Sequence, residues 1–176
     1  IDMGGTGATT AGGALTNLGG STAGIEAFKY SFNTVALLLA DTALTYSTID
    51  AGDYIRIRDG GYVYRVAAAG ASDHHLTIGA GGVVKLYVVF ELAQSPIAFG
   101  GKGDATTNDA AILTAMFGAM PVDATVDLGG KTYRTTSPVT ISKSVIVKNG
   151  EIFADHAGLT FDVNKSAKLI VDGVKF

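Results

Sequence analysis

Four carboxylates near the end of the chain are the strongest candidates for acid–base chemistry: Glu151, Asp155, Asp162 and Asp172. Hydrolysis of a glycosidic bond requires two carboxyl groups about 5 to 10 Å apart that flank the scissile bond. All four lie in or beside short apolar strands, and stacking of those strands can bring two of them together. Because outward acidic side chains on such strands are usually just solvated, we predict no catalytic residue in this chain.

Histidine and cysteine usage argues against a metal or a cofactor. His74 and His75 are adjacent, so their side chains point to opposite faces if the backbone is extended. His156 follows Asp155 in a predicted turn, which is a weak signal. The chain has no cysteine, which excludes disulfides, thiolate catalysis and cysteine-based zinc sites. We therefore predict no metal ligand and no cofactor-binding residue.

Tyrosines of the first half can stack on sugars, but they alternate with apolar residues. That alternation favours packing in a core or an interface. The tyrosines concerned are Tyr54, Tyr62, Tyr64 and Tyr87.

The composition limits the partners of the chain. Of its 176 residues, 47% are hydrophobic and only 16% are charged, which is more apolar surface than a lone monomer readily buries. Together with the abundance of Gly and Thr, this favours strands, turns and neighbouring subunits. The net charge of −3 offers no general attraction for nucleic acid. The longest apolar run near the start, Val35 to Ala40, is far too short to cross a bilayer. We therefore expect neither nucleic acid nor membrane as a partner.

The residues before about position 92 predict a small β-rich module with one helix. Apolar side chains recur at helical spacing and indicate a helix over Ser31 to Ala40. The stretch Asp53 to Arg58 alternates, and Asp59-Gly60-Gly61 then provides a strong hairpin signal. A second hairpin is predicted from strands at 75–78 and 83–90, joined by four residues that are mostly glycine.

The segment from Pro96 to Leu113 separates this module from the rest. Its pattern indicates an apolar strand end at Ile97 to Phe99 and a glycine-rich turn through Gly103.

A short helix is predicted next, with Thr106, Thr107 or Asn108 as its N-cap. Asp109 then falls in the first helical turn, where a carboxylate interacts favourably with the helix dipole. The predicted apolar face consists of Ile112, Ala115, Met116 and Ala119.

Short strands follow the helix, and two of them repeat. Residues 145–153 match residues 169–176, with an offset of 23 residues from Gly150 to Gly173 and from Phe153 to Phe176. This offset is close to one coil of a parallel β-helix, in which like strands stack. Because Phe176 lies in mid-pattern and an open strand edge invites aggregation, we expect the natural protein to continue for more coils.

The segment from Phe99 to Asp109, which precedes these strands, resembles a known family. It is similar to the segment Phe-Gly-Ala-x-Gly-Asp-Gly-x-x-Asp-Asp, with which pectate-lyase-like right-handed β-helices begin. Ala105 and Asn108 stand where the family usually has Gly and Asp. The stretch from Val126 to Arg134 also resembles the first coil of such proteins. In that family the segment is structural, which implies that Asp104 and Asp109 are turn and cap residues and not an acid and a base. The matched residues are Phe99, Gly100, Gly103, Asp104 and Asp109.

Residues 4–19 read Gly-Gly-Thr-Gly-Ala-Thr-Thr-Ala-Gly-Gly-Ala-Leu-Thr-Asn-Leu-Gly. This stretch resembles the motif Gly-Gly-Thr-Gly-Ala-Thr-Thr-Ala-x-x-Ala-x-x-Asn-Leu-Gly of bacteriophage tail fibre and tailspike proteins. Gly12 and Gly13 weaken any helix there by about 1 kcal/mol each relative to alanine. The alternative is a flexible linker, since Gly, Thr and Ala bury little apolar area. The residues that would mediate attachment are Gly4, Gly5, Thr6, Gly7, Asn17, Leu18 and Gly19.

The resemblance to tailspikes implies an order of parts: an attachment peptide at 1–24, a β-rich anchor module at 25–92, a linker at 93–96 and the first coils of a β-helix at 97–176. It implies a homotrimer on the phage virion, outside the cell, bound to a tail or baseplate protein. The whole protein would bind or cleave bacterial surface polysaccharide. The alternatives are a fragment of a secreted polysaccharide lyase or hydrolase, and a bacterial adhesin.

Overall fold

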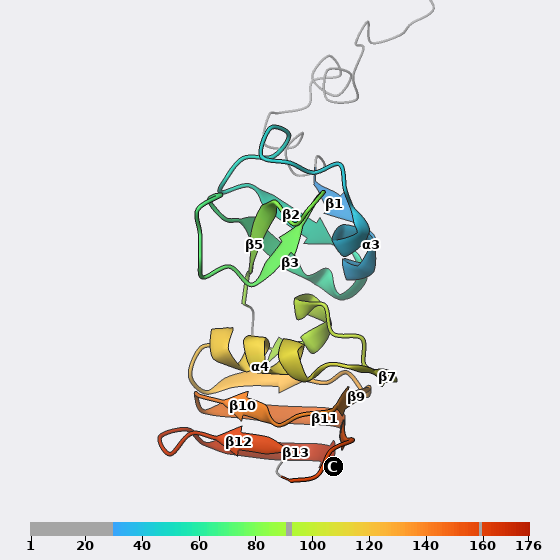
Figure 1. The fold of residues 1–176 in the computed structure, drawn as a ribbon, viewed down its shortest axis with the longest axis vertical. Helices are drawn as coiled ribbons and strands as arrows, with labels where there is room; N and C mark the ends of the chain where they lie inside the picture. The colour runs from blue at the N-terminus through green and yellow to red at the C-terminus, as the bar shows by residue number, and fades with distance from the viewer. Residues whose placement is uncertain (1–29, 91–92, 159) are drawn as a thin grey trace, which may run out of the picture.

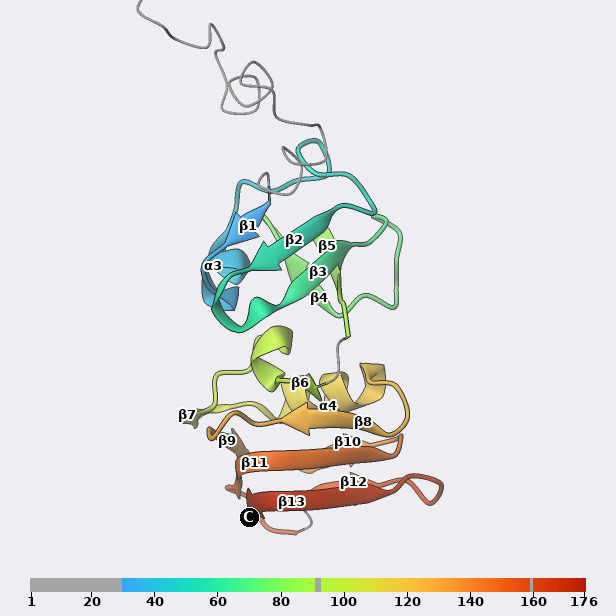
Figure 2. The ribbon, with the colours of Figure 1, turned by 180° about the vertical axis from the view of Figure 1, so that it is seen from behind.

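The computed structural model of the chain describes residues 30–90, 93–158 and 160–176. Its two parts, a five-stranded sheet with one helix and a stack of coils, follow one another along the long axis (Figure 1). Helix α4 (Ala110–Ala119) and the short helix η2 (Pro96–Phe99) lie between the two parts in both views (Figure 2). The fold is mainly β, a β-rich module followed by the start of a β-helix, as the sequence predicts.

The module consists of one sheet, with the order β1-β2-β3-β5-β4, and helix α3 (Val35–Ala40). Both predicted hairpins are confirmed, because β2 pairs with β3 and β4 with β5 in antiparallel fashion. The strands are β1 (Ser31–Phe32), β2 (Tyr54–Ile57), β3 (Val63–Val66), β4 (Leu76–Ile78) and β5 (Val84–Val88). The short helix η1 (Asp59–Gly61) forms the turn between β2 and β3.

Helix α3 begins later than the sequence predicts. Ser31 and Phe32 belong to β1, which pairs in parallel with β2. The helix is capped by Thr34, whose hydroxyl accepts a 3.2 Å hydrogen bond from the Leu37 amide. The predicted start at Ser31 was wrong because the strand that pairs with β1 lies more than twenty residues further along the chain.

Every strand pair of the coil stack is parallel, as in a β-helix. The first half of β11 (Val145–Ala154) pairs with β8 (Ala124–Asp127), and its second half pairs with β9 (Thr132–Thr135). β11 therefore bends and belongs to two faces of the coil, and β13 (Leu169–Lys175) lies beneath it in the same way (Figure 2). A separate sheet holds β10 (Val139–Ile141) and β12 (Phe161–Val163). The first coil contains β6 (Ala93–Gln94) and β7 (Asp104–Asn108).

The register of the last two rungs corrects the predicted offset of 23 residues. Val145 pairs with Leu169 and Gly150 with Val174, so the offset is 24 on both sides of the bend. The corner residues that correspond to one another are Asn149, with φ of 58°, and Gly173, with φ of 63°. Matching Gly150 to Gly173 was wrong by one residue, because Asn also adopts positive φ.

Helix α4 covers one end of the apolar interior of the stack and contacts β10. Its buried face consists of Ala110, Leu113, Met116 and Phe117. The predicted face shares only Met116 with it, because Ala115 is exposed and Ile112 and Ala119 are half-buried. At the opposite end of the stack the side chains of β13 are more open to solvent, and Val171 exposes 40% of its surface.

Candidate functional site

The segment that joins the two parts starts with a short helix and not with the predicted strand end. Ser95 caps η2 by accepting a 3.3 Å hydrogen bond from the Ile97 amide, and Pro96 occupies the first turn. Gly100 ends the helix with φ of 88°, which favours glycine. Phe99 is therefore the last residue of a helical turn, and its ring is buried.

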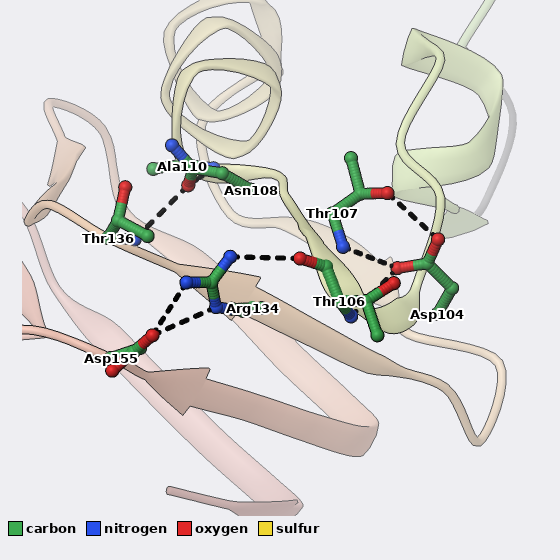
Figure 3. A network of polar contacts seen from close by, with 8 residues as sticks. All are labelled: Asp104, Thr106, Thr107, Asn108, Ala110, Arg134, Thr136 and Asp155. Atoms are coloured by element: carbon green, nitrogen blue, oxygen red, sulfur yellow. Dashed lines mark hydrogen bonds and ion pairs between the residues drawn. The ribbon is translucent and has the colours of Figure 1, made fainter.

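Asp104 organises the loop that follows (Figure 3). Its carboxylate accepts hydrogen bonds from the amides of Thr107 (2.7 Å) and Thr106 (2.9 Å) and from the Thr107 hydroxyl (2.8 Å). These bonds, the Thr107 amide above all, hold the pKa of Asp104 well below its ordinary value. The ionised side chain thus stabilises the turn that it belongs to.

Asp109 bridges this loop and helix α4. It is the N-cap residue, but its side chain bonds no helical amide. Its carboxylate instead accepts hydrogen bonds from the amides of Lys102 (3.0 Å) and Gly103 (3.1 Å), and it is only 1% exposed. Asp109 thus holds the glycine-rich loop against the start of the helix, a contact that spacing along the sequence does not reveal.

The residues predicted as N-caps lie in β7, one to three residues before the actual cap, Asp109. Of these, Asn108 has a bridging function: its side-chain oxygen accepts from the amides of Ala110 (3.2 Å) and Thr136 (3.1 Å) (Figure 3). It thereby connects the first coil to the second.

Arg134 is a connecting residue that the sequence analysis missed. Its guanidinium donates to the Thr106 carbonyl (2.9 Å) and forms an ion pair with Asp155 (2.6 Å) (Figure 3). Thr106, Arg134 and Asp155 belong to three successive coils, so one side chain spans them. The sequence does contain a signal for this ion pair: Arg134 and Asp155 have opposite charges, lie on outward positions and are 21 residues apart, which is about one coil.

The module and the first coil meet at Tyr64 and Ala98. The Tyr64 hydroxyl, on β3, donates a buried 2.7 Å hydrogen bond to the carbonyl of Ala98, in η2. Burial raises the pKa of Tyr64. Beside this bond, the ring of Phe99 packs against His75 (5.5 Å between centroids) and Phe90 (6.2 Å). This junction is the candidate functional site, because it fixes the module to the β-helix.

A cleft of about 370 Å³ opens next to the junction. Asp73, His74 and His75 line it from the module, and Lys143 lines it from the loop between β10 and β11. Asp73 accepts a 2.5 Å hydrogen bond from the Tyr87 hydroxyl. The Lys143 ammonium donates to the Met120 carbonyl (3.0 Å) at the end of α4.

The four candidate carboxylates do not converge on a site. Glu151 accepts a 2.8 Å hydrogen bond from the Thr132 hydroxyl, and Asp155 is paired with Arg134. Asp162 lies on β12, in the other sheet, and Asp172 lies opposite Lys148 on β13. Within the described ranges, no three His, Cys, Asp or Glu side chains are placed to hold a metal ion.

No helix in the described part of the chain combines the length and apolarity needed to span a membrane. The predicted attachment residues, Gly4 to Gly7 and Asn17 to Gly19, lie outside the described residues.

Comparison with known proteins identifies the fold. No protein-family model and no curated protein matches the chain. Among solved structures, full-length tailspike protein 2 from an Escherichia coli O157:H7 bacteriophage is similar, with a TM-score of 0.54 and 16% identity over 92% of this chain and 22% of that chain. The enzymatically active domain of tailspike protein 2 from bacteriophage CBA120 gives a TM-score of 0.55 and 16% identity over 91% of this chain and 25% of that one. The chain has a tailspike-like fold and spans about a quarter of these proteins or less.

Proposed function

We propose that this chain is the part of a homotrimeric phage tailspike or tail fibre that connects a virion-attachment peptide to a β-helix. In this proposal residues 1–24 bind a tail or baseplate protein, residues 25–92 form the anchor module, and residues 93–96 link it to the pectate-lyase-like, right-handed β-helix that begins at residue 97. The whole protein acts outside the cell on bacterial surface polysaccharide, which it binds or cleaves.

The observation that carries the proposal is the junction. A connector must transmit the orientation of one part to the next, and the buried bond from Tyr64 to Ala98 together with the packing of Phe99 supports a fixed geometry. Asp104, Glu151 and Asp155 are engaged in a turn, a hydrogen bond between coils and an ion pair, which favours a structural over a catalytic role. The tailspike-like fold agrees with this assignment.

Two experiments test the proposal. Sedimentation of the chain should give a mass of about three times 18.0 kDa. When residues 1–24 are deleted from the spike protein, phage particles should assemble but should not contain the spike. A matched deletion of three residues in the exposed 164–166 turn should leave incorporation intact. A stable monomer that releases reducing ends from polysaccharide would overturn the proposal in favour of a secreted lyase or hydrolase.

A further inference from the structure

His75 lies between the module and the β-helix. It directly precedes β4, and its ring contacts Phe99 of the first coil at 5.5 Å between centroids. Phe90 (5.4 Å) and Tyr87 (5.6 Å) approach the same ring from the module. Any change in the charge or orientation of this imidazole therefore acts on the junction.

The hydrogen bonds of His75 fix its protonation state. The Val88 amide donates a 2.9 Å hydrogen bond to Nδ1, which therefore carries no proton. The neutral ring then has its proton on Nε2. A protonated ring has two N–H donors and cannot accept from Val88, so the bond and a positive charge on His75 are mutually exclusive.

The surroundings of His75 disfavour its protonation, mainly because the ring is partly buried. The titratable groups that face it among the described residues are Asp73 and His74 on its own segment, the neutral Tyr87 on β5, and Lys143 of the β-helix. Burial lowers the pKa of His75 most; Asp73 opposes this, and His74 and Lys143 add to it. The Tyr87 hydroxyl donates a hydrogen bond to Asp73 and favours its ionised form, so Asp73 remains the main charge that opposes the effect of burial.

The cleft beside the junction gives a protonated ring access to water. Its wall on the β-helix side includes Ala115, Gly118 and Ala119 of α4, which are small residues, and Lys143. A charged imidazole that leaves the aromatic cluster can be solvated there without disrupting the core of either part.

We propose that His75 is a pH-sensitive latch: on protonation it releases the Val88 amide, turns toward the cleft and frees the module to move relative to the β-helix. The inference rests on the fold and not on the proposed function. Because the pKa of His75 is lowered in the folded chain, the latch is closed above the ordinary histidine value of about 6.5 and weakens as the pH falls below it. The bond from Tyr64 to Ala98 remains, so we expect mobility and not separation.

The distance between the two parts tests the latch. The chain has no cysteine, so Ala51→Cys in the module and Ser166→Cys in the β-helix can carry a spin-label pair. We expect a narrow distance distribution at about pH 8 that broadens at about pH 5, with unchanged far-ultraviolet circular dichroism. At the lower pH the Val88 amide should exchange about tenfold faster than in His75→Asn, the factor that corresponds to about 1.4 kcal/mol.

Two variants control the experiment. His75→Asn keeps a side-chain acceptor near Nδ1 but cannot be charged, so its distribution should stay narrow at both pH values. His74→Asn should broaden as the parent does, because the hydrogen bond of His74 Nδ1 is to the Ala71 carbonyl within the module and not to the Val88 amide. An unchanged distribution in the parent at about pH 5, equal broadening in His75→Asn, or loss of all secondary structure in both would overturn the inference.

Discussion

The hydroxyl of Tyr64 and the carbonyl of Ala98 lie 2.7 Å apart, although 34 residues separate them along the chain. Tyr64 stands in the middle of the module's sheet and has no exposed surface. Ala98 is in η2, at the start of the β-helix. A side chain of one part thus satisfies a buried backbone acceptor of the other, and the fold of each part depends on the position of its neighbour.

Removal of this hydroxyl should weaken the whole chain. Tyr64→Phe leaves the Ala98 carbonyl buried without its partner, so we expect a loss of about 1–3 kcal/mol in the free energy of unfolding. Denaturant titration followed by circular dichroism measures the change. Tyr54→Phe is the control, because Tyr54 is 58% exposed and its variant should stay near the parent. Equal stability of the two variants would show that the hydroxyl contributes nothing.

Gly150 and Gly118 should respond in opposite directions to alanine. A Cβ at Gly150 would lie 2.8 Å from the Lys131 carbonyl oxygen and would also collide with the Leu128 side chain. We expect Gly150→Ala to lower the stability by roughly 1–3 kcal/mol, as for other overpacked sites. Gly118 lies inside α4 with open space around it, so Gly118→Ala should raise the stability by up to about 1 kcal/mol. Thermal unfolding of both variants checks the pair.

Asp109 should be more important for stability than its exposed neighbours. Asp109→Ala leaves the amides of Lys102 and Gly103 without their acceptor, and we expect a cost of about 1–3 kcal/mol. Asp109→Asn keeps one oxygen acceptor and should cost less. Proteolysis under native conditions should locate the effect, with faster cleavage at the 100–103 loop in the alanine variant. A variant as stable and as resistant as the parent would refute the bridge.

Asp104 should give the stability a dependence on acid pH. Its folded pKa lies below its ordinary value of 3.8, so the ionised form is favoured by folding. The contribution is complete above that ordinary value and decreases as the pH falls toward the folded pKa. In Asp104→Asn this contribution is absent at every pH. The stability difference between parent and variant should therefore shrink below about pH 4, and a constant difference would contradict the assignment.

The strands were predictable because period-two alternation reflects a local preference that the tertiary structure preserves. Ile55, Ile57, Tyr64 and Val66 are all buried, as their spacing indicates. The short helix η2 is also predictable from the sequence, since Ser95 provides an N-cap, Pro96 a first-turn proline and Gly100 a terminating glycine. The apolar character of Ile97 to Phe99 taken alone predicts a strand end, which is wrong because these residues belong to η2.

Other features depend on contacts that no local pattern contains. β1 forms because Ser31 and Phe32 pair with Arg56 and Ile57 of β2. The sequence of Ser31 and Phe32 alone does not indicate a strand. Likewise, the amides that Asp109 accepts from lie six and seven residues before it, in a loop shaped by glycine. The buried face of α4 was missed because its residues Leu113 and Phe117 face the coil interior, and helical spacing alone fits more than one face.

Helix α4 lies over one end of the coil interior, whereas β13 presents open backbone groups at the other. Among the described residues β13 pairs only with β11, so its outer edge is open to one more parallel strand, whereas α4 covers the interior at the opposite end. The two ends of the stack are therefore not equivalent, and strand addition is possible at one of them and blocked at the other.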